Sequence, residues 1–327
     1  MKVKHLLHCH LVVPADRLRA LAAVQPLPAL KKLLNWSLPP VLCKTGIQEW
    51  HCQQFEVAPQ RDYPTASLAA LGADLGPGRD YWLHADPVYV HLLRDRIILT
   101  DETFADLGSD DAQAVVETLN RHFAGQEMAF LVVGKHWYLR LQSFPDISTS
   151  PREAALNADI QQHLPTGPDA RRWHQCLNEI QMLLHDHPVN QAREHRGALP
   201  INSLWLSGGG VLPPVQAKPF AEIWANDALL AGLAAASACS RFPAPVAAES
   251  WLEQAHADGA ALLVPEPGSD FEQDWFAPLA NALKVGRLQS LALHVAAPSQ
   301  VQSLVIPRTQ CWKFWRRANP LDFAIHD

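Results

Sequence analysis

The sequence lacks the patterns that would point to nucleic acid, a membrane or secretion. Lys and Arg together number 27 against 33 Asp and Glu, so the formal net charge is −6 and no basic surplus can neutralise phosphates. General nucleic-acid binding is therefore not expected. The most apolar stretch, 228–239, is mostly alanine and too short to span a bilayer, so no membrane span is expected. The short polar N-terminus lacks the form of a secretory signal.

No Cys-x-x-Cys pair occurs among the six cysteines, which stand far apart at Cys9, Cys43, Cys52, Cys176, Cys239 and Cys311. In a chain of 327 residues, scattered cysteines are typical of reduced, mostly buried thiols. We therefore expect a cytoplasmic protein. The spacing of Cys43, His51 and Cys52 fits no standard zinc module, and we interpret these residues as structural.

What is present is a globular composition, 48% hydrophobic and 18% charged. Signals for strands and helices alternate at both ends of the chain, and hairpin signals lie between them. This order predicts an α/β fold, with a three-layer core of residues 1–80 and 200–327 and an inserted α+β domain at 81–199.

Local patterns predict individual elements within this plan. The acidic run Ser109-Asp110-Asp111 is a helix cap, and the helix after it runs to about residue 123. Strand signals at 130–133 and 137–141 form a hairpin around Gly134-Lys135. The remaining expected elements are a first strand at 5–13, paired strands at 81–90 and 96–100, a helix at 169–185, a strand at 203–206 that ends in a glycine turn at 208–210, a helix at 271–283 and a last strand at 290–295.

Three segments share the pattern of one known family. They are Thr65–Gly72 followed by Pro77-Gly78-Arg79-Asp80, then His187-Pro188-Val189-Asn190 with Arg193, Gly197, Pro200 and Asn202, and finally Gly208-Gly209-Gly210. Together they resemble the archaeal-type, metal-dependent, cofactor-independent phosphoglycerate mutases of the alkaline phosphatase superfamily, most strongly over about residues 175–235. The middle of the chain and its Trp-rich ending also resemble the bacterial RpfE-type regulatory proteins.

The resemblance implies an alkaline phosphatase-like core, two divalent metals held by Asp and His, and a Ser that accepts the phosphoryl group. The residues at the corresponding positions differ. The first strand ends in Leu11-Val12-Val13-Pro14 where the family has Asp-Gly-x-Gly-Asp, and Tyr63 stands at the nucleophile position. Ser207 and His84 replace two arginines of the family.

The late part of the chain departs from the family in the same way. It offers Glu266, Asp270, Asp274 and His294, but Ile306-Pro307-Arg308 replaces the family's His-Ser-x-Asp-x-x-Pro. We therefore predict a non-catalytic relative that acts as a regulatory or binding protein, with no catalytic residue, no bound metal and no cofactor. The competing prediction is an active metal-dependent phosphoglycerate mutase or phosphohydrolase with two Mn or Zn ions. It would use Thr65 or Ser67 as nucleophile and the acids Asp62, Asp86 and Asp270.

A small anionic ligand is expected in the cleft between the domains. An Arg beside a chain return can grip a carboxylate bidentately, and a glycine run after a strand can offer backbone amides to an anion. The candidate ligand-binding residues are Asn190, Arg193, Asn202, Gly208, Gly209, Gly210, His84 and Asp86. For Arg193, a salt bridge that braces the insertion on the core is an equal alternative.

Two further groups of residues stand out. His8 and His10 share one face of the first strand, which suits two imidazole ligands, but no acid stands at a matched position, so core or interface histidines are favoured. Near the C-terminus, Trp315, Arg316 and Arg317 are of the residue types that dominate protein–protein contacts. We predict that they contact an unknown protein partner, whereas Trp312 docks back onto the fold.

Overall fold

The computed structural model describes residues 7–93, 96–100, 104, 106–255, 259–266 and 268–312. The chain divides into two compact units. Met1–Glu56 and Val215–Asp327 form one, here called the core unit, and Val57–Pro214 form the inserted unit. The sequence-based division set the boundaries at 80/81 and 199/200. The structure sets them at 56/57 and 214/215, because the helix at 65–72 packs on the sheet of the inserted unit and residues 203–210 are a strand of that sheet.

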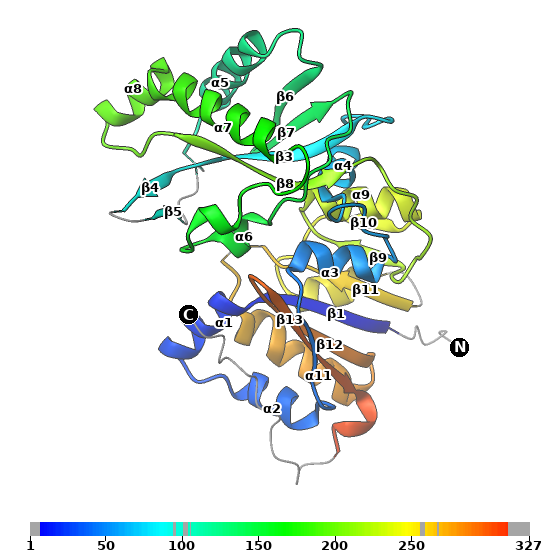
Figure 1. Ribbon diagram of the computed structural model, residues 1–327. Coiled ribbons are helices and arrows are strands. Elements are labelled where there is room, and N and C mark those ends of the chain that lie inside the picture. Colours follow the sequence, from blue (N-terminus) through cyan, green and yellow to red (C-terminus); the bar gives the residue numbers. More distant parts are fainter. Residues whose placement is uncertain are drawn as a thin grey trace. The chain divides into compact units, whose positions relative to one another are not determined.

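The predicted fold class is confirmed, since the chain is an α/β protein with a mixed sheet in the core unit and a separate antiparallel sheet in the inserted unit. The core sheet has seven strands in the order β10-β9-β11-β1-β12-β13-β2 (Figure 1). The pairs from β10 to β12 are parallel, whereas β13 is antiparallel to both β12 and β2. The strand bounds are Ser240–Phe242 (β10), Glu222–Trp224 (β9), Gly259–Leu263 (β11), Leu7–Pro14 (β1), Leu288–Ala297 (β12), Gln300–Pro307 (β13) and Val41–Cys43 (β2).

Helices cover both faces of the core sheet, as the alternation of β1 requires. Cys9, Leu11 and Val13 lie in one apolar cluster with side chains of α1 (Ala15–Val24), α2 (Pro28–Trp36), α10 (Ala248–Gln254) and α11 (Ala277–Val285). The intervening residues, among them His8 and His10, therefore point to the opposite face, as predicted. That side carries α3 (Ile47–Gln54), which packs against β13 and α9 (Ala228–Ser237).

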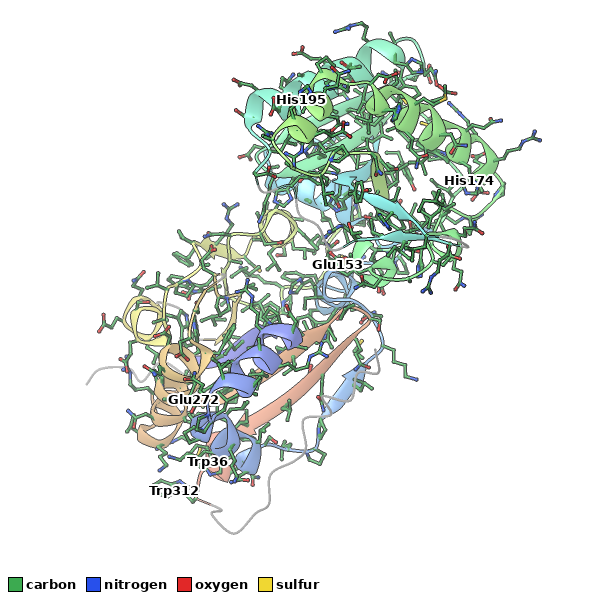
Figure 2. The ribbon with its side chains drawn as sticks, turned by 90° about the vertical axis from the view of Figure 1, so that its left-hand side faces the viewer. Trp36, Glu153, His174, His195, Glu272 and Trp312 are labelled. Atoms are coloured by element: carbon green, nitrogen blue, oxygen red, sulfur yellow. The ribbon has the colours of Figure 1, made fainter. Side chains whose placement is uncertain are left out.

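The helix predicted at 271–283 begins with a π-helical turn, Phe271–Phe276, that continues directly into α11. The buried carboxylate of Glu272 accepts hydrogen bonds from the backbone N–H groups of Ala29 and Leu30 at the start of α2. Those N–H groups have no partner within the helix, so the carboxylate stabilises the helix start. Trp36 and Glu272 are both labelled on this helical layer in Figure 2.

The inserted unit has an antiparallel sheet in the order β6-β7-β3-β8. The strands are Met128–Val133 (β6), His136–Leu141 (β7), Tyr81–Val88 (β3) and Ser203–Gly210 (β8). Side chains of α5 (Ser109–His122), α7 (Ala170–His185) and α8 (Pro188–His195) form its main apolar cluster with the sheet, and α4 (Thr65–Gly72) packs on β3 and β8. Shorter elements are β4 (Val90–Leu92), β5 (Ile97–Leu99), α6 (Arg152–Ala155) and η1 (Ile160–Gln162), and η3 (Arg308–Gln310) closes the described part of the core unit.

Three local predictions are wrong. Residues 81–88 pair with β7 and β8, and only the short β4 and β5 form the pair expected between 81–90 and 96–100. The strand at 290–295 is not the last one, because β13 folds back beside it through a tight turn. The glycines at 208–210 form no turn but belong to β8. For residues 81–88 and for the glycines, pairing with a distant strand decided the structure, whereas β13 joins β12 as a local hairpin.

Two smaller expectations concern the cysteines and membrane-spanning helices. All six cysteines are free thiols. Among the helices of the described residues, none combines the length and the apolar character that crossing a membrane requires.

Candidate functional site

Three neighbouring strands of the core unit bring polar side chains together into one hydrogen-bonded chain. His10 on β1 and His294 on β12 are joined by an Nδ1–Nε2 distance of 3.0 Å. The other ring nitrogen of His294, Nδ1, lies 2.8 Å from the Ser303 hydroxyl on β13. Parallel and antiparallel pairing therefore places residues 284 positions apart in direct contact. The sequence identified His10, but no local signal linked it to His294.

A third imidazole, His51 on α3, completes what we call the imidazole cluster of His10, His51 and His294. Trp50 packs against two of its rings, with centroid distances of 4.5 Å to His294 and 5.4 Å to His51. The Nε2 atom of His51 is buried and has no hydrogen-bond partner within the described residues. His51, which the sequence analysis interpreted as structural, therefore has a buried ring nitrogen that makes no hydrogen bond within the described residues.

Burial keeps the imidazole cluster neutral. It lowers the pKa of His10 to about 4, with a further contribution from neighbouring His8. It also lowers the pKa of His51 to about 4, although Asp227 opposes the shift. The pKa of His294 lies well below its ordinary value because of burial and then of His10 and His51. Neutral imidazoles can bind metals, yet among the described residues no three His, Cys, Asp or Glu side chains are placed to hold one ion.

In the inserted unit, the glycine run of β8 makes room for neighbouring side chains. Gly208 has φ +64° and lies at a bulge opposite the β3 segment between Trp82 and His84. A Cβ atom on Gly208, Gly209 or Gly210 would approach Thr65, Tyr81 or Pro64, respectively, closer than 3.0 Å. The space on the side-chain face of these glycines is therefore filled by the chain's own side chains. Anion binding by the three glycines stays a prediction.

One hydroxyl and one acid of the predicted alternative site, those of Ser67 and Asp62, already have partners nearby. Ser67 is fully buried, and its hydroxyl donates to the carbonyl of Pro64 at 3.0 Å. Asp62 accepts hydrogen bonds from the backbone N–H and the hydroxyl of Thr149. Burial raises the pKa of Asp62, whereas the hydrogen bonds from Thr149 and from the backbone of Gly209 lower it.

His84 and Asp86 lie on β3 but in different surroundings. The His84 ring is buried and packs 5.7 Å from the ring of Tyr138, its direct neighbour on β7. Burial raises the pKa of Asp86 to about 7, and Glu153 adds to this effect while Arg152 opposes it. A carboxyl group with this pKa can exchange protons near neutrality. The surroundings of Asp86 therefore favour acid–base chemistry.

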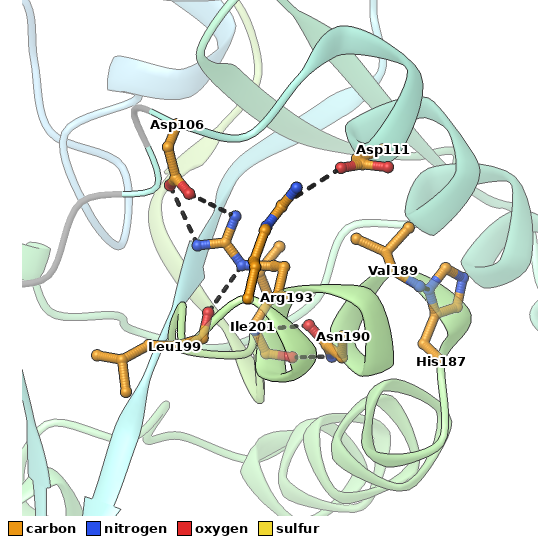
Figure 3. A network of polar contacts seen from close by, with 9 residues as sticks. Asp106, Asp111, His187, Val189, Asn190, Arg193, Leu199 and Ile201 are labelled. Carbon is orange, nitrogen blue, oxygen red and sulfur yellow. Dashed lines mark hydrogen bonds and ion pairs between the residues drawn. The ribbon is translucent and has the colours of Figure 1, made fainter.

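Asn190 and Arg193 take part in a polar network inside the inserted unit (Figure 3). The guanidinium of Arg193 is 3% exposed and pairs bidentately with Asp106 at 3.0 and 3.1 Å, and its Nε donates to the carbonyl of Leu199. The pair lowers the pKa of Asp106. Asn190 donates to the carbonyls of Leu184 and Ile201 and accepts from the Ile201 N–H.

This network favours a bracing role over ligand binding. Asn202 likewise exchanges two hydrogen bonds with the backbone of Val90, so it ties β4 to the start of β8. The brace formed by Arg193 lies within the inserted unit, which differs from the predicted bridge to the core. Binding of a small anion by Asn190, Arg193, Asn202, His84 or Asp86 stays a prediction.

Two other groups of predicted residues lie elsewhere. Asp270 belongs to the core unit, where its carboxylate accepts from the N–H groups of Glu272 and Gln273 at the start of the π-helical turn. The proposed partner-binding residues Trp315, Arg316 and Arg317 lie outside the described residues. Trp312, expected to dock back, is 67% exposed.

Comparison with known proteins gives a consistent set of distant relatives. No model of a known protein family matches the chain. It is 24% identical to a probable 2,3-bisphosphoglycerate-independent phosphoglycerate mutase of Geobacter sulfurreducens over 147 residues, which are 44% of this chain and 37% of that protein. It is 28% identical to the corresponding mutase of Methanothrix thermoacetophila over 116 residues, 36% of this chain and 29% of that protein. The matches thus span well under half the length of these curated relatives.

The fold is similar to that of the PH0037 protein from Pyrococcus horikoshii, with a TM-score of 0.52, 16% identity and coverage of 97% of this chain and 91% of that one. At this identity the likeness concerns the fold alone. The sequence matches make the chain a distant relative of the archaeal-type cofactor-independent phosphoglycerate mutases of the alkaline phosphatase superfamily.

Proposed function

We propose that this chain is a non-catalytic relative of the cofactor-independent phosphoglycerate mutases that acts as a regulatory or binding protein, in the manner of the RpfE-type proteins it resembles. The observation that carries the proposal is that polar side chains of the kind that phosphoryl transfer would need already form hydrogen bonds with the protein's own backbone. Ser67, Asp62 and Asp270 each hold a backbone group of their own unit. A nucleophile must be free to approach phosphorus, and a metal-binding carboxylate must be free to approach the ion.

The imidazole cluster supports the same proposal. In a two-metal site, imidazole nitrogens face the ions and are held by partners on their other side. Here one nitrogen of His294 faces His10 and the other faces Ser303, so both ring nitrogens are occupied by the protein.

The test is metal analysis of the purified chain together with assays on 3-phosphoglycerate and on p-nitrophenyl phosphate in the presence of Mn²⁺. We expect no stoichiometric metal and no turnover. Two tightly bound ions together with turnover would overturn the proposal. Should turnover be seen, Ser67→Ala and Thr65→Val would show whether these hydroxyls cause it, and Ser109→Ala, which changes a hydroxyl at an exposed helix start, is the matched control.

We further propose that Trp315, Arg316 and Arg317 contact the protein partner, because Trp and Arg contribute most to the binding energy of such interfaces. Once a partner is identified, Trp315→Ala together with Arg316→Ala is expected to weaken its binding by at least tenfold. Trp312→Ala is the matched control within the same segment. If the wild type, the double variant and Trp312→Ala bind the partner with equal affinity, the three residues do not form the contact.

The competing function is an active metal-dependent phosphoglycerate mutase or phosphohydrolase. The sequence relationship to the mutases favours it, as does the pKa of Asp86 near neutrality. The same metal and turnover measurements decide between the two functions.

A further inference from the structure

The inserted unit contains a cavity of about 280 Å³ that none of the functions considered so far uses. It lies where α7, the first residues of β8, the β4–β5 pair and the segment after η1 meet (Figure 1). His174, one of its lining residues, is labelled on the inserted unit in Figure 2. All lining residues belong to this unit, so the cavity does not depend on the core unit.

The walls of the cavity are mainly apolar. Val90 and Ile97 contribute from the β4–β5 pair, Leu177 from α7, and Trp205 from β8. The indole N–H of Trp205 is already bonded to the carbonyl of Ser150 at 2.9 Å, so this side chain offers the cavity an apolar surface. A cavity with such walls favours an apolar ligand because filling it removes apolar surface from water.

The lack of charged side chains in the lining disfavours phosphate and carboxylate ligands. Among the described residues that line the cavity there is no Asp, Glu, Lys or Arg. A phosphate or carboxylate would lose its hydration here without gaining a countercharge, which is strongly unfavourable. The expected ligand is therefore neutral.

A few polar side chains would orient such a ligand. The Nε2 atom of His174 lies 2.8 Å from the carbonyl of Pro165, so it donates to this oxygen, which leaves Nδ1 as the nitrogen that can accept a hydrogen bond. Within the described part of the chain, Gln181 makes a long hydrogen bond of 3.5 Å from its amide nitrogen to the Ser203 hydroxyl, and its amide oxygen is a second acceptor. Either group can accept a hydrogen bond from an N–H or O–H donor of a ligand.

The volume limits the size of the ligand. A dry cavity of about 150 Å³ lined by apolar side chains binds benzene, so about 280 Å³ has room for roughly two fused rings. We propose that this cavity binds a neutral molecule the size of two fused rings that carries a hydrogen-bond donor. This inference does not rest on the proposed function, because a non-catalytic protein and an enzyme could both carry such a site.

Calorimetric titration of the full chain with indole tests the proposal. We expect saturable binding of indole, and binding at least fivefold weaker for benzofuran, which has the same shape without the N–H donor. Inorganic phosphate and 3-phosphoglycerate are expected to leave indole binding unchanged. The proposal fails if indole does not saturate, or if phosphate competes with it.

Two adjacent residues provide a matched pair of variants. Ile97 lines the cavity, whereas Ile98, the next residue of β5, does not. Ile97→Trp should fill the cavity and abolish indole binding, and Ile98→Trp should retain it. Equal effects of both variants would place the bound indole elsewhere and overturn the assignment.

A milder substitution covers the case in which a tryptophan at either position prevents folding. Gln181→Leu removes one acceptor from the cavity, while Gln175→Leu makes the same change on an exposed position of α7. We expect Gln181→Leu to reduce the preference for indole over benzofuran and Gln175→Leu to keep it. An unchanged preference in both variants contradicts the role of the amide.

Discussion

Acidification is expected to destabilise the core unit through the imidazole cluster. His10 and His51 have a pKa of about 4 in the folded chain, compared with an ordinary value of 6.5. Well above pH 6.5 the folded and unfolded chains are both neutral at these groups. Between pH 6.5 and pH 4 the unfolded chain binds protons that the folded chain does not, so the free energy of unfolding decreases in this window.

The expected loss follows from the difference between the two pKa values. At about pH 5, each of the two histidines should reduce the free energy of unfolding by roughly 2 kcal/mol. His294 changes it in the same direction, since its pKa is lowered too. Such a loss is a large part of the stability of an ordinary domain.

Urea unfolding followed by tryptophan fluorescence, at about pH 7.5 and at about pH 5, measures this loss. His51→Gln removes one titrating group, and we expect the variant to lose about 2 kcal/mol less than the wild type on acidification. Comparing each variant with the wild type cancels the contribution of the inserted unit. His185→Gln, at a side chain that is 85% exposed, is the control and should behave like the wild type. An equal loss in wild type and His51→Gln would refute the reasoning.

Two further predictions concern the inserted unit. Arg193→Lys should lower its free energy of unfolding by about 1–3 kcal/mol, because a lysine cannot keep both contacts to Asp106 and the bond to Leu199. Arg196→Lys, at a half-exposed ion pair of 3.7 Å, should change it by less than about 0.5 kcal/mol, and a similar cost for both in urea unfolding would contradict the brace. Gly208→Ala should cost about 2–4 kcal/mol through its positive φ and the clash with Thr65, whereas Gly134→Ala, which has a positive φ but open space around it, should cost only about 1 kcal/mol. Equal decreases in melting temperature for the two glycine variants would show that Thr65 moves aside at little cost and would contradict the prediction.

The sequence by itself determined the elements whose signals are local. The helix after Ser109 repeats its apolar residues with helical spacing, and the hairpin around Gly134 joins two runs that suit strands. Both were predicted within one to two residues. The α/β class followed from the order of such elements, and the shared face of His8 and His10 followed from the period of a strand.

Only the tertiary structure decided which distant residues meet. Nothing near His10 in the sequence indicates a partner 284 residues away, because the contact depends on the order of β1, β12 and β13 in the sheet. The glycines of β8 suggest a turn until their place in the strand that pairs with β3, with side chains of β3 and of Pro64 and Thr65 beside them, is seen. Arg193 was equally compatible with a ligand and with a brace, and the position of Asp106 favours the brace. These outcomes depend on burial and on contacts across long sequence separations, which local propensity does not encode.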